Sequence, residues 1–381
     1  VIPNLVCMLI AGPVLAMVLV PGVVHAMSAG GITRARAVLA QVTGRLLTVA
    51  AGVVGLLMVL SPVVAWTLTF GIPDPAQRAR GLWLTTVLVL IVAPQVLLYT
   101  LVHLGVAAQQ SRGRFALAAA APAVENVVLI LTVIVAGWYY GAGLHAGDVG
   151  VGLVIVLGVG STVAVALQAT LQLFGAARVG LLTWPSMRRR HDSDARAIIR
   201  RMMRSVGVAA WPAAAMYVVI ALAGTVPGGV FVVQLSHTVF FSLTFASARA
   251  VSMAALPGLA QAAQCQDSAM FGMQWRRGLS YTLVASLPLL VLLALLAAPI
   301  ANILAAGQLR HAALIHPLGI CLAIAAVAQL VSGVHDIGRQ ALFARLNDRI
   351  PRRASEVAFG VTVVVAAAAL VLPPAGLASS G

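Results

Sequence analysis

The sequence predicts an all-α polytopic membrane protein, and two observations carry that prediction. Hydrophobic residues make up 61% of the 381 positions and charged residues only 9%, which leaves too little polar surface to cover a water-soluble domain of this size. The apolar residues also gather in long unbroken runs, and a helix needs about 20 such residues to cross the hydrocarbon core. A membrane β-barrel would instead show short alternating segments.

Ten apolar runs are long enough to be spanning helices. They lie at 3–26, 46–71, 82–108, 116–139, 150–176, 206–225, 229–261, 279–304, 312–337 and 355–375. The seventh run is too long for one upright helix, so we expect it to tilt, to extend beyond the membrane or to break near Pro257.

The arginines predict the orientation of these spans. All 24 basic residues are arginine; numbering the connections alternately places twenty of them on one side and three on the other, with Arg249 inside a span. Because cytoplasmic loops are rich in basic residues, we expect Val1 outside, the loop at 179–204 in the cytoplasm, and the protein in the cytoplasmic membrane. Charge dispersed among short loops is not the contiguous basic face of a nucleic-acid-binding protein, so no nucleic-acid partner is expected.

The one substantial polar connection reads "MRRRHDSDARAIIRRMMR" at 187–204. It predicts an N-terminal bundle at 1–178, a basic cytoplasmic loop at 179–204 and a C-terminal bundle at 205–381. We expect the loop to form a surface helix that sets topology and anchors at the interface. Alternatively, the loop binds anionic lipid headgroups or an envelope-synthesis protein. The arginines concerned are Arg188, Arg189, Arg190, Arg200 and Arg201.

Two pairs of similar short segments indicate an internal repeat. "AMVLVPG" at 16–22 resembles "SMAALPG" at 252–258, and "SPVVAWTLTFG" at 61–71 resembles "APIANILAAG" at 298–307. Six spans separate the matching elements, and an even number preserves orientation, so the pattern predicts two parallel-repeat helix bundles. Each copy is one helix short, which predicts that a complete protein extends past both termini.

Four stretches occur in order along the chain: "IPNL" at 2–5, "APQVLLYTLVHLGVAAQQSRGRFALAAAAPAVEN" at 93–126, "LPGLAQAA" at 256–263 and "LFARLNDRIP" at 342–351. In this order and spacing the sequence resembles the MurJ/MviN family of lipid II flippases, within the multidrug/oligosaccharidyl-lipid/polysaccharide exporter superfamily. The resemblance covers nearly the whole chain, as helices two to eleven of fourteen. It implies a transporter of a lipid-linked peptidoglycan precursor.

The chain departs from the family pattern at several positions. Cys7 and Met8 stand where the family often has two basic residues, His237 or Thr238 aligns with a cavity arginine of the eighth helix, and Asn347 replaces an acidic residue. A cavity for a diphosphate should be cationic, because arginine offsets the desolvation of the anion. These substitutions favour a divergent member.

Charged residues at membrane depth need a partner, a wet cavity or a role. Arg249 can meet a phosphate, pair with Glu125 or extend towards an interface. Glu125, followed by Asn126, can couple transport to a proton or cation, or be a protonated or hydrogen-bonded packing residue. His103 and His237 can line the pathway or pack as neutral histidines.

Asp336 and Arg339 are three residues apart near a cytoplasmic helix end, and Arg345 follows them. This spacing permits a local ion pair that braces the turn or gates the pathway. Cys7, Cys265 and Cys321 are far apart, so neither a zinc site nor a disulfide framework is expected. With nine acidic residues and no catalytic set, neither an enzyme nor a cofactor is expected.

The leading hypothesis is therefore an alternating-access flippase for lipid II or a related undecaprenyl-linked saccharide. One alternative is a cation-coupled exporter of small amphipathic compounds, with Glu125 as the coupling site. The other is a transport-inactive membrane scaffold for cell-envelope synthesis.

Overall fold

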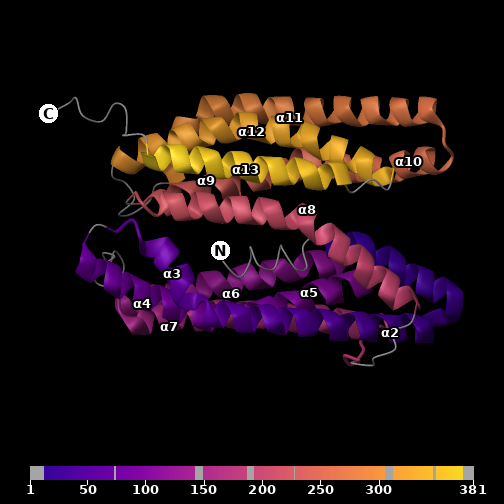
Figure 1. Ribbon diagram of the computed structural model, residues 1–381, viewed down its shortest axis with the longest axis horizontal. Coiled ribbons are helices and arrows are strands. Elements are labelled where there is room, and N and C mark those ends of the chain that lie inside the picture. The colour runs from indigo at the N-terminus through magenta and orange to yellow at the C-terminus, as the bar shows by residue number, and fades with distance from the viewer. Residues whose placement is uncertain are drawn as a thin grey trace. The chain divides into compact units, whose positions relative to one another are not determined.

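The computed structural model describes residues 13–72, 74–141, 149–186, 193–226, 228–304, 312–345 and 349–371, and these residues contain helices and no strand. The first helices are α2 (Pro13–Val59), α3 (Ser61–Thr69), α4 (Pro75–Val92), α5 (Gln95–Gln110), α6 (Ala116–Tyr140) and α7 (Val151–Arg178). The later ones are α8 (Ser193–Ala223), α9 (Gly229–Thr244), the π-helical turn η2 (Phe245–Arg249), α10 (Ala250–Gln264), α11 (Ser268–Leu304), α12 (Ala312–Ala344) and α13 (Arg349–Val371) (Figure 1). The predicted all-α class is confirmed.

The helices form two compact units, Val1–Tyr217 and Val218–Gly381, and the division falls inside α8. In the first unit, α7 packs against α4, α5 and α6, and α2 packs against α5. In the second unit, α11 and α12 run alongside each other, and α9, η2 and α10 pack against α12 (Figure 1). The parallel repeat relating two bundles stays a prediction.

Eight helical segments of the described chain are long and apolar enough to cross a membrane, against ten expected. The expected span at 206–225 belongs to α8, whose apolar part is only Ala210–Ala223. The expected first span begins among residues 1–12, which lie outside the described residues. The remaining eight expected runs each overlap one of the observed segments.

The expected polar connection between the first two spans is instead helical. Gly30 and Gly31 alone interrupt α2, and Gly31 has φ 66° and ψ −168°, a conformation that glycine adopts without strain. Leu19 and Val23 before the interruption share a buried cluster with Val38 and Val42 after it. The expected start of the second helix at 46 was therefore wrong, because two glycines change the chain direction without a loop.

One of the three expectations for the seventh apolar run, a break near Pro257, is not met, and the tilt and the extension beyond the membrane stay predictions. The irregularity of this run is the π-helical turn Phe245–Arg249, whereas Pro257 lies within the continuous helix α10. A π-turn inserts one residue into a helical turn and is frequently found at functional sites. Proline alone did not indicate the position of this irregularity.

The connection after α7 is packed against α2. Ser186 donates its backbone N–H to the carbonyl of Ala40 at 2.9 Å, and Arg36 donates from Nε to the carbonyl of Gly180. In α8, Ala195, Ile198 and Met202 are buried in the cluster that contains Leu19 and Val23. The start of the basic loop is thus part of the first unit.

Valine at position 44 is expected to loosen this connection. A Cβ on Gly44 would lie 2.4 Å from the carbonyl oxygen of Ser186, so the 181–186 segment must move away, at a cost of about 1–2 kcal/mol. Faster protease cleavage between residues 178 and 193 would show this. Gly52→Val is the control, because a Cβ on Gly52 meets nothing within 4 Å.

Candidate functional site

A charged cluster lies where η2, α10 and α12 meet in the second unit. Asp336 on α12 is only 7% exposed. Its Oδ2 accepts a hydrogen bond from Ser252 Oγ on α10 at 2.8 Å, and its Oδ1 accepts one from the guanidinium of Arg339. Both carboxylate oxygens are therefore engaged, and Asp336 joins two helices whose sequence positions are 84 residues apart.

Arg249 completes the cluster from the end of η2. It is partly buried, and Asp336 and Arg339 both act on it electrostatically. Its guanidinium carbon lies 6.0 Å from the ring centroid of Phe245. Within the described residues its side chain has no ion pair. With two arginines and one carboxylate, these three residues carry an excess positive charge.

Close packing at Gly333 positions η2 against α12. A Cβ on Gly333 would lie 2.7 Å from Cβ of Ala248 and 3.0 Å from Cγ2 of Thr282 on α11. Only a glycine allows the π-turn to approach so closely. The contacts of Gly333 therefore bring η2 and α11 together on α12, one turn before Asp336.

Aromatic rings lead from α9 to Arg249 at intervals of four residues. The ring centroids of His237 and Phe241 are 6.3 Å apart, and those of Phe241 and Phe245 are 6.1 Å apart. The predicted residue Thr238 is exposed beside this row and donates to the carbonyl of Gln234 at 2.8 Å. The structure thus brings His237 and Arg249 onto one face of α9 and η2.

The first unit brings Glu125 and His103 together through Tyr99. Tyr99 donates its hydroxyl to Oε1 of Glu125 at 2.7 Å, and Nδ1 of His103 lies 2.7 Å from the carbonyl oxygen of Tyr99. Glu125 is partly buried on α6, and its neighbour Asn126 is exposed. This arrangement supplies the partner that a carboxylate at membrane depth requires.

The other predicted arginines make none of the contacts described above for the charged cluster, where they fall within the described residues. The guanidinium carbon of Arg345 is 4.1 Å from the ring centroid of Phe271 on α11. Arg200 is exposed on α8, and Arg201 follows it in that helix. Arg188, Arg189 and Arg190 lie outside the described residues.

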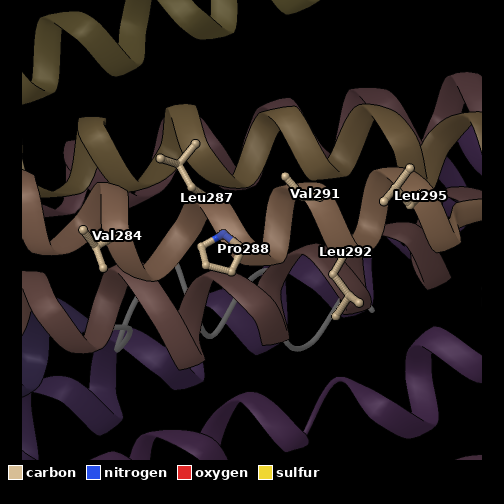
Figure 2. Close-up of a pocket in the computed structure, with 6 residues that line it drawn as sticks. All are labelled: Val284, Leu287, Pro288, Val291, Leu292 and Leu295. Carbon is tan, nitrogen blue, oxygen red and sulfur yellow. The ribbon is translucent and has the colours of Figure 1, made fainter.

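An apolar groove lies on α11 in this unit, lined by Val284, Leu287, Pro288, Val291, Leu292 and Leu295 (Figure 2). Its lining contains no charged side chain, and Val284 and Leu295 are 69% and 75% exposed. Such a surface offers no charged or hydrogen-bonding side chain to a polar ligand.

A sequence model of the family "Lipid II flippase MurJ" matches residues 1–380. The chain belongs to this family. The predicted resemblance is confirmed, and the chain is a multi-pass membrane transporter of the flippase family, which is not a family of enzymes. No curated protein sequence matches it.

Two solved structures are similar to this member of the flippase family. A structure described as lipid II flippase MurJ in an inward closed conformation has a TM-score of 0.73 and 14% sequence identity, covering 97% of this chain and 72% of that one. An inward-facing MATE family multidrug resistance transporter of the MOP superfamily has a TM-score of 0.60 and 11% identity, covering 96% of this chain and 89% of that one. At these identities the two structures establish the fold.

Three residues of this flippase family member contact the predicted site residues but were not predicted from the sequence. Tyr99 lies four residues before His103, a helical spacing that offered a signal. Phe245 similarly precedes Arg249 by four residues. No sequence pattern around Ser252 indicated its role, because its hydrogen-bond partner Asp336 is on a helix that is distant in the sequence.

Proposed function

We propose that this chain moves lipid II, or a related undecaprenyl-linked saccharide, across the cytoplasmic membrane by alternating access. Membership of the flippase family supports the substrate class. The bias of the arginines towards one set of connections supports entry of the headgroup from the cytoplasmic side. The diphosphate meets Arg249.

The observation that carries this assignment is the surplus of positive charge around Asp336. Arg339 already pairs with the carboxylate, whereas Arg249 has no ion pair within the described residues. A guanidinium in a membrane-spanning segment is costly to leave without a partner. Phosphate oxygens match its geometry, since the planar donors of arginine bind two of them at once.

The test is rescue of a strain depleted of its lipid II flippase by the full-length protein. Arg249→Ala is expected to reduce rescue at least about tenfold, because charge-assisted hydrogen bonds contribute about 1.5–3 kcal/mol each. Arg249→Lys keeps the charge but loses the two-pronged geometry, so it should rescue to an intermediate degree.

Membrane expression of each variant is measured in parallel. Arg276→Ala is a matched control, since that arginine is exposed on α11 in the same unit and belongs to no predicted site. Full rescue by Arg249→Ala at normal expression would contradict the assignment of Arg249. Absence of rescue by the unchanged protein would contradict lipid II as its substrate.

The Tyr99–Glu125 contact favours a second candidate, cation-coupled export. A carboxylate held by one hydroxyl on a membrane-spanning helix can exchange a proton or bind a cation. Under this candidate, Glu125→Gln should abolish transport that depends on an ion gradient while Arg249→Ala retains it. The opposite result favours the flippase.

A further inference from the structure

The Arg339–Asp336 pair should respond when a phosphate binds at Arg249. Arg249 is influenced electrostatically by both Asp336 and Arg339, whereas Asp336 pairs only with Arg339 within the described residues. A dianionic diphosphate attracts both guanidinium groups and repels the carboxylate. This step rests on the proposed function, because it assumes that the anion enters at Arg249.

The hydrogen bonds of Asp336 show how the carboxylate is held in place. Ser252 donates to Oδ2 at 2.8 Å, so the carboxylate stays on the contact between α10 and α12 even when Oδ1 is released. Nε of Arg339 is buried and makes no hydrogen bond within the described residues. The guanidinium is thus engaged on one side only, which leaves donors for an incoming anion.

We infer that Asp336 is a resident counterion of Arg339, which the diphosphate of the lipid headgroup displaces. Before substrate arrives, the carboxylate stabilises an arginine in a poorly solvated position. When the diphosphate binds, Arg339 moves from Asp336 to the phosphate, and the retained negative charge limits the affinity. When the diphosphate leaves, the carboxylate of Asp336 pairs with Arg339 again. Asp336 therefore favours rapid turnover over tight binding of the substrate.

The binding test uses the full-length protein in nanodiscs of phosphatidylcholine, a lipid with no net charge. The ligands are farnesyl diphosphate, a short prenyl diphosphate, and inorganic diphosphate, each titrated by calorimetry. Asp336→Asn is expected to bind both ligands about tenfold more tightly, the size expected when one like charge leaves a partly buried site. In the flippase rescue assay, cells that carry the same variant should grow more slowly than cells that carry the unchanged protein.

A double-mutant comparison covers the possibility that Asp336→Asn leaves Arg339 unpaired and destabilises the protein. Arg339→Gln should weaken binding, and the double variant Asp336→Asn/Arg339→Gln should bind more tightly than Arg339→Gln alone. Neither of these contains an unpaired Arg339. Glu356→Gln is the control, because it removes a partly exposed carboxylate that pairs with Arg352 in the same unit.

Unchanged or weaker binding in Asp336→Asn, together with no gain in the double variant, would overturn the counterion role. If Arg249→Ala still abolished binding, the proposed function would survive that result. Unchanged binding in Arg249→Ala would instead overturn the site of the proposed function. Tighter binding of inorganic diphosphate than of farnesyl diphosphate by the unchanged protein would contradict a lipid headgroup as the displacing anion.

Discussion

Valine at position 105 is expected to destabilise the first unit by about 3 kcal/mol or more, a cost typical of severe overpacking. Gly105 is buried on α5. A Cβ there would lie 2.8 Å from the carbonyl carbon, the carbonyl oxygen and Cβ of Gln172 on α7. Because two of these atoms belong to the backbone, no change of side-chain rotamer relieves the clash. The two helices must separate.

The measurement for Gly105→Val is the apparent unfolding temperature in detergent, followed by intrinsic fluorescence. Gly137→Val on α6 is the matched control, since a Cβ on Gly137 meets nothing within 4 Å. Both variants carry the same change in helix propensity, so the difference between them isolates the clash. Equal unfolding temperatures would mean that α5 and α7 are not packed this closely.

Leucine at position 172 is expected to cost about 2–3 kcal/mol, because it leaves buried polar groups without partners. Gln172 is fully buried. Its Oε1 accepts from Nε2 of Gln109 at 2.6 Å, and its Nε2 donates to the carbonyl of Ala118 on α6 at 3.2 Å. One side chain thus joins α7 to both α5 and α6, as expected for polar contacts between spanning helices.

A double-mutant cycle separates the lost hydrogen bond from the changed packing. Gln109→Leu/Gln172→Leu removes both partners, so it should be less destabilising than the sum of the two single variants. Unfolding temperatures in detergent give the four values. A double variant that equals or exceeds the sum would show that the two glutamines do not interact.

Much of the fold follows from residues read in order. The apolar runs predicted α6 and α7 to within a few residues, because each is bounded by polar or glycine-rich connections. The run at 82–108 was predicted as one span, and it is α4 and α5 with an interruption at Ala93 and Pro94. The extent of α2 was missed because arginines at 34, 36 and 45 suggested a loop, whereas the helix continues through all three, with Arg36 and Arg45 exposed and Arg34 partly buried.

The candidate site was only partly predictable. Arg249 and Glu125 were identified because charge within an apolar run is costly whatever the fold. Their partners were not identified, since Ser252 and Tyr99 are unremarkable among the polar residues of such helices. The π-turn that ends at Arg249 packs closely against Gly333 of α12, and no local pattern near residue 245 indicates it.

The sequence by itself determined the class of protein, the approximate spans and the residues that need an explanation, because these depend on hydrophobicity and charge along one chain. The tertiary structure decided which of those residues meet. Asp336 accepts a hydrogen bond from Ser252, 84 residues away in the sequence, and Gln109 donates one to Gln172, 63 residues away. Such partners depend on the rotation and relative height of neighbouring helices, which the helical period leaves open and which close packing at Gly105 and Gly333 fixes.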